Sequence, residues 1–385
     1  IKRCRFAFWV SYLTLAPKER GTSREFILFR EGPTIGVHIQ ETVISSVYTF
    51  PVLANVWILL VPVSWALAAW SLLALVRVPL YRLWKPAIAA TEWGHWLLCF
   101  SLGIAVAGFR TGPHAGVVVP ASIAVVLFGS PSVRAILSAK RIQKEIDEVF
   151  PRRAKDVAAN FSRLSPFLVS DLPHIAIPMV ERSRVVYRKV EEARLTMDLY
   201  RAKGITEKLP VVIVVHGGSW SGGDSSELEG MNRYLAASGY AVAAINYRLA
   251  PTFCFPAPIE DIRGAISFLE ERGNELGIDA ARVVLLGRSA GGHLALLAAY
   301  TLGNKVIRGV VGLYPPTDMR WSWQHPSPKR IMDSNEAISN FIGGTLEEAP
   351  ETFDQASPIR LVRSDSPPTL LIHGGKDMLV SPLQS

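Results

Sequence analysis

The sequence predicts two parts: a helical transmembrane region in residues 1–150, followed by an α/β domain in residues 151–385 with a doubly wound, mostly parallel sheet. Three observations predict this division. Long apolar runs without charged residues dominate the first part, and short β-branched runs alternate with helical stretches in the second. The third observation is composition, since 49% of the 385 residues are hydrophobic and only 19% are charged. Water-soluble chains usually carry about a quarter charged residues.

Composition and charge also exclude several classes of protein. The net charge is +8 and the mean hydropathy is +0.23, so a largely disordered chain is excluded. The basic charge does not predict nucleic-acid binding, because no basic-aromatic platform or zinc-finger spacing accompanies it. Together with long apolar runs it fits an anionic lipid surface better. The cysteines Cys4, Cys99 and Cys254 lie far apart and predict neither a disulfide framework nor a metal site.

Apolar runs predict the helices of the first part. The run Val43–Val76 is longer than the roughly 20 apolar residues that span a bilayer core, and its helix is expected near 53–76. The runs near 96–109 and 116–133 are short for full spans. They predict either two short helices or one re-entrant hairpin. A soluble, all-helical core is the alternative to a membrane region.

Basic residues bear on the predicted localisation, which is an integral, multi-pass membrane protein. Lys and Arg crowd every flank, so the positive-inside rule finds little asymmetry between the loops. The basic stretch after the last apolar run favours a cytoplasmic C-terminal domain. That stretch, Ala139–Phe150, has the pattern of a basic amphipathic linker. The wider segment Ser138–Phe161 is expected to cap the site, to lie along the membrane or to be a solvated helix.

The second part alternates strands and helices. Continuous apolar runs are typical of buried parallel strands. The predicted strands are Val185–Val190, Leu195–Tyr200, Val211–Val215, Ala241–Ile245, Val283–Leu286, Val306–Leu313 and Thr369–Ile372. The predicted helices are Ser226–Ser238, Ala257–Leu276 and Gly292–Leu302. This alternation predicts the doubly wound parallel sheet.

The most informative motif is GRSAG at residues 287–291. A predicted strand precedes it and a predicted helix follows, as the G-x-S-x-G nucleophile elbow requires. The strained turn lifts the Ser289 hydroxyl above the sheet, so Gly287 and Gly291 must be small. The Ala290 N–H then points at the developing oxyanion, where the helix N-terminus adds a favourable field. Ser289 is therefore the predicted nucleophile.

Another predicted strand ends in His216-Gly217-Gly218, with Trp220 two residues further on. Loops of this sequence supply the other oxyanion donors, because glycine lets the backbone approach the substrate closely. We expect the Gly217 and Gly218 amides to complete the oxyanion hole with Ala290. His216 is expected to brace the loop through hydrogen bonds rather than to transfer protons.

The predicted strand 369–372 ends in the sequence HGGKD. Asp377 follows the nucleophile, as the order of this kind of triad requires, and is the predicted acid. The base should be a later histidine, and none follows in the chain, so we expect that the chain stops before it. His293 is expected to be structural, His373 to lie under the acid loop, and His325 to lie in a Trp-rich segment.

Taken together, HGGSW, NYRLAP, FPAPIED, GRSAGG and LLIHGGKD resemble the α/β-hydrolase superfamily. The motifs occur in this order between about Arg182 and Ser385. Within this superfamily, the motifs resemble the esterase/lipase branch, which includes hormone-sensitive-lipase-like and BD-FAE carboxylesterases. The loop reads HGGSW rather than HGGG, which is similar to BD-FAE and kynurenine-formamidase-like members. An α/β-hydrolase fold for the second part is what the resemblance implies.

The resemblance also implies roles for residues that match its motifs. Ser289 would be the nucleophile and Asp377 the acid, while Arg248 and Asp261 would form a structural pair. The supporting motif residues are His216, Trp220, Gly287 and Gly291. The segment Met319–Phe353 is expected either to form part of a lid or to pack in the core.

The implied function is a membrane-anchored serine carboxylesterase or lipase-like hydrolase. Ser289 would attack an ester carbonyl while a histidine takes its proton, and water would hydrolyse the acyl-enzyme. The expected partners are a small-molecule or lipid ester and membrane lipid, without nucleic acid, metal or organic cofactor, and the oligomeric state is open. Two alternatives stay open: an arylformamidase-like amidase, indicated by HGGSW, and a catalytically inactive binding module, indicated by the missing histidine.

Overall fold

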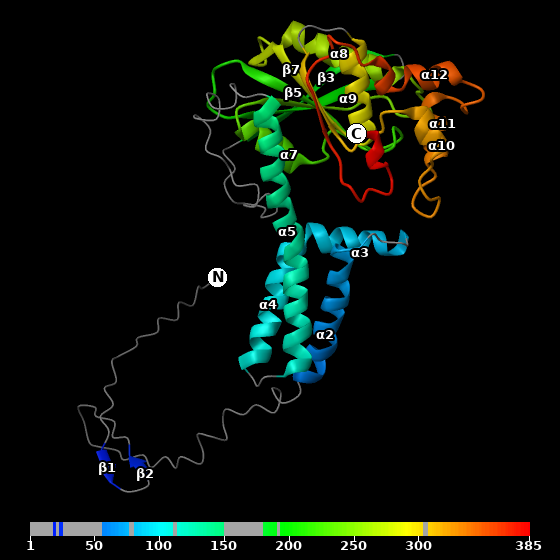
Figure 1. The fold of residues 1–385 in the computed structure, drawn as a ribbon. Helices are drawn as coiled ribbons and strands as arrows, with labels where there is room; N and C mark the ends of the chain where they lie inside the picture. The colour runs from blue at the N-terminus through cyan, green and yellow to red at the C-terminus, as the bar shows by residue number, and fades with distance from the viewer. Residues whose placement is uncertain are drawn as a thin grey trace, which may run out of the picture. The chain divides into compact units, whose positions relative to one another are not determined.

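The computed structural model describes residues 18–20, 23–25, 56–76, 81–110, 114–149, 180–190, 193–302 and 307–385 (Figure 1). Two compact units divide the chain. We call Ile1–Val76 with Lys85–Ile136 the helical unit, and Arg77–Trp84 with Leu137–Ser385 the α/β unit. A short antiparallel ladder pairs β1 (Lys18–Arg20) with β2 (Ser23–Glu25).

The apolar runs of the first part form complete helices. These are α2 (Val56–Ser71), the 3₁₀ turn η2 (Leu72–Ala74), α3 (Tyr81–Glu92), α4 (Gly94–Arg110) and α5 (Ala115–Val149). The stretch Ala139–Phe150, predicted to be helical, is helical up to Val149, where it forms the end of α5 and continues the apolar run without a break. The rest of the predicted linker lies outside the described residues. Helix α3 was not predicted, because its pattern is only weakly apolar.

Helix α4 packs closely against α5 at two of its glycines. A Cβ added to Gly94 would lie 2.7 Å from the Phe128 carbonyl oxygen, and one added to Gly108 would lie 3.0 Å from the Val117 side chain. The start of α4 therefore lies beside the middle of α5, and the end of α4 beside its start. The two helices run antiparallel, and glycine allows the close approach.

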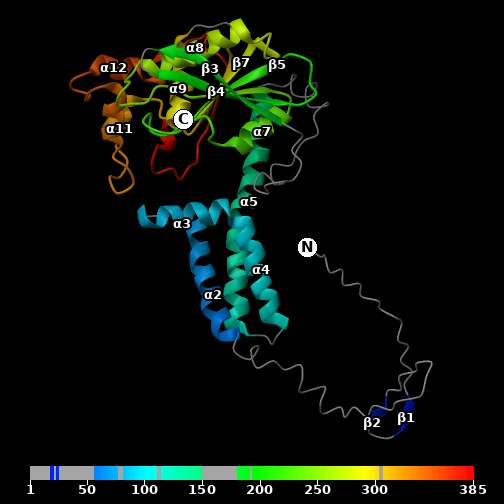
Figure 2. The same ribbon diagram turned by 180° about the vertical axis from the view of Figure 1, so that it is seen from behind.

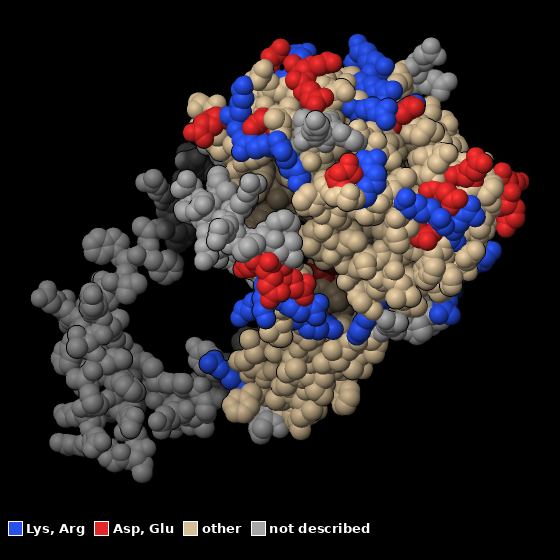
Figure 3. Space-filling view, turned by 45° about the horizontal axis from the view of Figure 1, so that its top comes forward, with Lys and Arg blue, Asp and Glu red and all other residues tan. Residues whose placement is uncertain are grey.

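The helical unit buries small and hydroxyl side chains together with a few large apolar ones, such as Phe128, and exposes many large apolar side chains. Its buried residues include Ser64, Ser71, Ser101, Ala121 and Ala124. Its exposed large residues include Leu59, Trp65, Phe100, Phe109 and Val126. Figure 3 shows little charge on the visible surface of these helices, whereas acidic and basic side chains are spread over the α/β unit. Of the described helices, Ala115–Glu148 is long and apolar enough to cross a membrane by length and composition.

A seven-stranded, mostly parallel sheet forms the centre of the α/β unit, in the order β3-β4-β6-β5-β7-β8-β9. The strands are β3 (Val180–Val190), β4 (Ala193–Ala202), β5 (Leu209–Val215), β6 (Ala241–Ile245), β7 (Ile278–Arg288), β8 (Ile307–Leu313) and β9 (Thr369–Ile372). The pairings β3–β4 and β4–β6 are antiparallel, and the others are parallel. The predicted parallel sheet is confirmed, with an antiparallel edge added.

Helices cover both faces of this sheet (Figures 1 and 2). On one face α8 (Ala257–Arg272) and α9 (Ala290–Thr301) pack on β7 and β8, and on the other α7 (Glu229–Ala237) packs on β4 and β6. Alternate side chains of strand β5 point to opposite faces of the sheet. Ile213 belongs to the core on the face of α8 and α9, and Val214 belongs to the core on the face of α7. Burying a side chain of this size contributes roughly 1.5–3 kcal/mol.

Two predicted helix starts were wrong by a few residues. Helix α9 begins at Ala290, directly after the elbow serine, and α7 begins only at Glu229. The delay has a local cause, because the Asp224 side chain accepts a hydrogen bond from the Ser226 amide at 2.6 Å. Such side-chain bonds offer the backbone an alternative to helix.

A segment between β8 and β9 carries short helices. They are α10 (Met319–Gln324), α11 (Ser334–Ile342), α12 (Pro350–Gln355) and the 3₁₀ turn η3 (Pro358–Leu361), and a last turn η4 (Pro382–Gln384) follows β9. Aspartates cap the first two: Asp318 accepts from the Trp321 amide and Asp333 from the Glu336 amide. Helix α11 ends at Gly343, whose φ of +92° glycine adopts without strain.

Candidate active site

Ser289 lies on a tight turn between the end of β7 and the start of α9. Its φ is +50° and its ψ is −125°, a conformation that non-glycine residues rarely adopt. Its amide donates to the Leu313 carbonyl at 2.9 Å, which ties the turn to the neighbouring strand β8. Strain of this kind persists only where the surroundings hold it, and it is common at functional sites.

The two motif glycines are required by close backbone packing. A Cβ on Gly287 would lie 2.1 Å from the Gly291 carbonyl oxygen. A Cβ on Gly291 would lie 2.2 Å from the carbonyl oxygens of Val215 and His216. The turn is therefore pressed both against itself and against the end of β5, and any side chain at either position would push it apart.

The loop after β5 lies against this turn. A Cβ on Gly217 would lie 3.1 Å from the Arg288 carbonyl oxygen and 3.4 Å from the Ser289 Cβ. Gly218 has a φ of +112°, and its Cβ would lie 2.2 Å from the Gly222 carbonyl oxygen. The structure thus brings the predicted donor segment beside the predicted nucleophile, with a tight fit at Gly217 and a strict need for glycine at Gly218.

His216 is buried and braces this loop. Its ring stacks on Tyr247 with centroids 4.3 Å apart, and its Nδ1 lies 2.7 Å from the Gly217 carbonyl oxygen. The Tyr247 hydroxyl donates to the His216 carbonyl at 3.1 Å. Burial lowers the pKa of His216, despite the opposing hydrogen bond to Gly217. These contacts fit a structural role for this imidazole.

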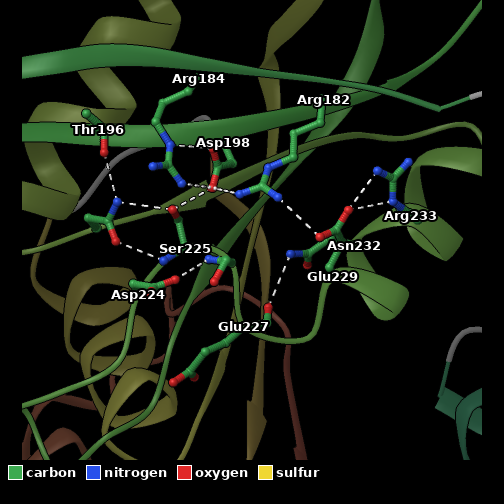
Figure 4. Close-up of polar contacts among 12 residues, drawn as sticks. Arg182, Arg184, Thr196, Asp198, Asp224, Ser225, Glu227, Glu229, Asn232 and Arg233 are labelled. Carbon is green, nitrogen blue, oxygen red and sulfur yellow. Dashed lines mark hydrogen bonds and ion pairs between the residues drawn. The ribbon is translucent and has the colours of Figure 1, made fainter. Parts of the chain in front are cut away.

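A buried polar network, shown in Figure 4, anchors the far end of the same loop. The Asp198 carboxylate on β4 accepts from Arg184 at 2.8 and 2.9 Å, from Arg182 at 2.9 Å and from the Ser225 hydroxyl at 2.6 Å. The Ser225 amide donates to the Asn246 side chain at 2.8 Å. Ser225 is thereby held between two strands, which fixes where the loop returns to the sheet.

These contacts set the pKa of Asp198. Burial alone would raise it, but hydrogen bonds from Arg184, Ser225 and Arg182 outweigh burial and hold the pKa of Asp198 well below its ordinary value. The carboxylate therefore stays ionised over the working pH range. A second buried carboxylate, Asp261, is paired with Arg248 at 2.9 Å. The predicted structural pair is confirmed.

A pocket opens beside Ser289. Its lining comes from the loop after β5, the elbow, α10 and α11 with their connection, and the turn after Asp377. The lining residues are Ser219, Trp220, Ser289, Ala290, Pro316, Trp321, Ser322, His325, Ser327, Met332, Ser334, Ile338, Leu379, Val380 and Ser381. Four segments distant in sequence therefore meet around one serine hydroxyl.

The segment Met319–Phe353 divides between pocket and core. Trp321 lines the pocket and stacks on His325 at 4.3 Å. Phe341 and Phe353 are fully buried in the main core of the α/β unit. The core interpretation is therefore confirmed for Phe341 and Phe353, and the lid stays a prediction for the part that lines the pocket. The segment with Trp321 was predicted as a possible lid, but His325 and Met332 were not named as pocket residues, because sequence order does not show which side chains face the elbow.

Asp377 lies at the turn after β9. Its Oδ1 accepts from the Leu379 amide at 2.8 Å and from the Val380 amide at 3.0 Å. The Nε2 of His373 lies 3.4 Å from Asp377 Oδ2 and 3.1 Å from the Val380 carbonyl oxygen. The structure places residues just after Asp377 in the pocket of Ser289, while the carboxylate itself is used within its own turn.

Among the described residues, no histidine forms a hydrogen bond with the Ser289 hydroxyl. His216 and His293 are buried with their own partners, as expected. His325 lines the pocket but is exposed and stacks on Trp321. His373 contacts the acid, as its expected position under the acid loop implies.

Comparisons with known proteins extend over the α/β unit. Residues 197–385 match the BD-FAE family. Esterase LipC of Mycobacterium tuberculosis is 33% identical over 220 residues, which cover 52% of this chain and 52% of that protein. Esterase LipQ of the same organism is 27% identical over 236 residues, 56% of this chain and 54% of that protein. A solved structure, a bacterial heroin esterase, superposes with a TM-score of 0.45 at 25% identity, covering 52% of this chain and 67% of that one.

The family match and the curated relatives support an α/β-hydrolase of the esterase/lipase group for this half of the chain. The chain spans about half the length of the curated relatives it matches. The matched region contains the elbow, the loop after β5 and the turn that carries Asp377.

Proposed function

We propose that this protein is a membrane-attached serine hydrolase that cleaves carboxylic esters. Ser289 is the nucleophile, Asp377 is the acid of a Ser-His-Asp triad, and the amides of Gly217, Gly218 and Ala290 form the oxyanion hole. The substrate is a small-molecule or lipid ester. The relatives named above, which are esterases, support this assignment.

The observation that carries the proposal is the strained conformation of Ser289 beside a glycine loop. A serine at a φ of +50° on a strand-to-helix turn has no structural advantage, because glycine would adopt that φ without strain. The conformation directs the hydroxyl outward, into the pocket that Ser289 helps to line. The first amide of α9 follows directly, at Ala290.

The chemistry proceeds in two steps. The Ser289 oxygen attacks the ester carbonyl as a histidine takes its proton, the C–O bond to the alcohol breaks, and the protonated alcohol leaves. Water then attacks the acyl-enzyme, and the acid is released with the serine hydroxyl restored. In each step the negative oxygen is stabilised by the amides of the loop after β5 and of Ala290, and losing one such donor costs about a hundred- to thousandfold in rate.

Active-site labelling tests the nucleophile. The full chain is treated with a fluorophosphonate probe and assayed with short and long p-nitrophenyl esters and with an N-formyl anilide. We expect labelling and ester turnover in the wild type, and at least a thousandfold loss of both in Ser289→Ala. Hydrolysis of the anilide alone would instead favour the amidase. A folded protein that neither labels nor turns over ester would favour an inactive binding module.

Substitutions of the two histidines near the site are compared with Ser289→Ala in the same assays. His325 lines the pocket and stacks on Trp321, and His373 contacts the Asp377 carboxylate, so each has a partner other than the Ser289 hydroxyl. We expect His325→Ala and His373→Ala each to lower kcat by less than about tenfold, against the much larger loss expected when a triad base is removed. A loss as large as that of Ser289→Ala would identify the altered histidine as the base.

The proposal of membrane attachment rests on the helical unit, whose surface exposes many large apolar side chains. The long helix Ala115–Glu148 is apolar enough to cross a bilayer. The side chains of Trp65, Phe100 and Val126 are each more than half exposed, which is unfavourable in water and favourable in lipid. Hydroxyl groups point inward, and Ser101 bonds the Leu97 carbonyl of its own helix at 2.7 Å. We expect the protein to stay in the membrane fraction after an alkaline carbonate wash, and its release would contradict the assignment.

The arrangement of the helices supports a cytoplasmic α/β unit. Arg134 of α5 donates to the Ala74 carbonyl at the end of α2, at 2.7 Å, so these two positions lie at the same end of the bundle. The segment Arg77–Lys85 adds three basic residues after that end of α2. At the other end, Arg110 is the last residue of α4, and residues 111–114 and 36–55 have no Lys or Arg. Under the positive-inside rule, this distribution of Lys and Arg around α2, α4 and α5 supports a basic end that faces the cytoplasm.

A pair of C-terminal fusions tests this orientation. In a bacterial host, we expect a green fluorescent protein fusion to fluoresce and an alkaline phosphatase fusion to be inactive, since the α/β unit follows the basic end of α5. The reverse pattern would overturn the orientation without affecting the assignment of Ser289.

A further inference from the structure

His293 is a buried imidazole that the reaction scheme does not use. It lies in the first turn of α9, and its amide donates to the Ser289 carbonyl at 3.0 Å. Its backbone is therefore tied to the elbow. Its side chain is fully buried and reaches two other parts of the site, the loop after β5 and the backbone after α12.

The hydrogen bonds of His293 define its tautomer. The Trp220 indole Nε1 lies 3.1 Å from His293 Nδ1, and an indole N–H can only donate, so Nδ1 accepts. The ring proton is then on Nε2, which donates to the Ala356 carbonyl at 2.7 Å. A neutral imidazole satisfies both partners, while a protonated one would set two donors against each other. Burial lowers the pKa of His293 to about 4, so the ring is neutral at neutral pH.

The partner Trp220 holds a strained loop in place. Ser219 and Trp220 have φ values of +53° and +60°, so two consecutive non-glycine residues adopt left-handed conformations. Each such residue costs roughly 1–2 kcal/mol, and the surroundings must hold the loop in this form. The indole is buried, stacks on Phe341 of α11 with centroids 4.7 Å apart, and meets His293 edge-on at 5.3 Å.

The two halves of the proposed oxyanion hole belong to different segments. The Ala290 amide is on α9, and the Gly217 and Gly218 amides are on the loop after β5 that carries Trp220. An oxyanion hole works only if its donors lie about 2.7–3.1 Å from the developing charge, so the distance between the segments must be held closely. The bond between Trp220 and His293 joins the two segments within a few residues of these donors.

We propose that His293 is a positioning residue for the oxyanion hole: it accepts from Trp220 and donates to Ala356, and so fixes the glycine loop relative to Ser289. The inference rests on the proposed function. Since the oxyanion develops only in the reaction, a displaced loop lowers kcat and leaves ground-state binding, and hence KM, nearly unchanged.

Three variants remove the contacts one at a time. The carbonyl of Asn can replace Nδ1 as the acceptor, so His293→Asn keeps the bond to Trp220. The longer His293→Gln keeps a donor near Nε2 and loses the acceptor. Trp220→Phe keeps an aromatic ring on Phe341 and removes the indole donor.

We expect His293→Gln and Trp220→Phe each to lower kcat by about 10- to 100-fold with KM within about threefold, and their combination to be no worse than the lower single variant, because both break the same bond. His293→Asn should recover kcat to within about threefold of the wild type, which a merely structural role would not predict. The readout is the full kinetics of p-nitrophenyl acetate, with the melting temperature of each variant.

Tyr300→Phe is the matched control. Tyr300 is on the same helix and its hydroxyl bonds Thr369 at 2.8 Å, away from the loop, so this variant should melt earlier with unchanged kcat. Wild-type kcat in both His293→Gln and Trp220→Phe, or strictly additive losses in their combination, would overturn the positioning role. If His293→Gln does not fold, Trp220→Phe decides. Failure of the proposed function would show separately, as turnover that persists in Ser289→Ala or is absent from the wild type.

Discussion

The α/β unit and the helical unit differ in the polar groups that they bury and in the large apolar side chains that they expose. In the α/β unit, strands and helices bury large apolar residues, and the buried carboxylates Asp198 and Asp261 are paired with arginines. In the helical unit, hydroxyl and small side chains such as Ser71 and Ala124 are inside, while Phe100 and others face outward.

The difference is the one expected if the helical unit lies in lipid, as proposed above, and the α/β unit lies in water. In water, exposed apolar area is unfavourable and charge is well solvated, so the α/β unit keeps its apolar side chains inside. In lipid, the outer surface must be apolar, and helices associate through close packing of small residues such as Gly94 and Gly108. The composition of the whole chain is therefore an average of two unlike surfaces.

The largest expected effect on stability comes from removing the buried Asp198 carboxylate of the α/β unit. Asp198→Ala leaves Arg182 and Arg184 without their buried partner, so we expect the free energy of unfolding to fall by about 3–5 kcal/mol. Chemical denaturation of the α/β unit in detergent measures it. The control is Asp365→Ala, which breaks an exposed pair with Arg363 and should cost less than about 1 kcal/mol. Equal losses would show that burial of the carboxylate does not matter.

The same carboxylate predicts a pH dependence. The pKa of Asp198 is lower in the folded than in the unfolded state, so the unfolded chain takes up a proton first as pH falls. This contribution to stability is complete above the unfolded pKa of about 3.9 and is lost progressively as pH falls below it. Asp198→Asn should flatten the acid limb of stability against pH, and an unchanged limb would contradict the prediction.

A lysine placed on the surface of the helical unit tests whether that surface lies in lipid. Phe100 is 57% exposed on α4, so in water Phe100→Lys would be harmless. In a bilayer a lysine near the centre of a helix costs about 2.5–3.5 kcal/mol, and we expect less protein in the washed membrane fraction. Phe100→Leu is the control and should behave as the wild type. A lysine variant that accumulates in the membrane normally would break the comparison.

The smallest effect compares one buried serine from each unit. The Ser225 hydroxyl donates to the Asp198 carboxylate, and bonds to charged groups contribute about 1.5–3 kcal/mol, so Ser225→Ala should destabilise by that amount. The Ser71 hydroxyl bonds only the Ala68 carbonyl of its own helix at 2.7 Å, and Ser71→Ala should cost less than about 1 kcal/mol. Unfolding of each variant in detergent measures both, and a larger loss for Ser71→Ala would contradict this reasoning.

Local pattern was enough to predict most elements. Continuous β-branched runs such as Val211–Val215 and Ala241–Ile245 predicted central strands, because a strand buried on both faces must be apolar throughout. The antiparallel edge strands β3 and β4 were underestimated in length, since their arginines and lysines hide the β pattern. Helix α5 was split in the prediction, because a change from apolar to charged composition looks like a boundary although the backbone continues.

The sequence by itself determined the turn that carries Ser289, because GRSAG between a strand and a helix constrains the backbone locally, and Gly287 is crowded by Gly291 of the same motif. It also determined which half of the chain is apolar. Only the tertiary structure decided that Trp220 bonds His293, that Asp198 anchors Ser225, and that Trp321 and Met332 line the pocket of Ser289. Those contacts join positions tens of residues apart, and their formation depends on how strands and helices pack, which no local pattern encodes.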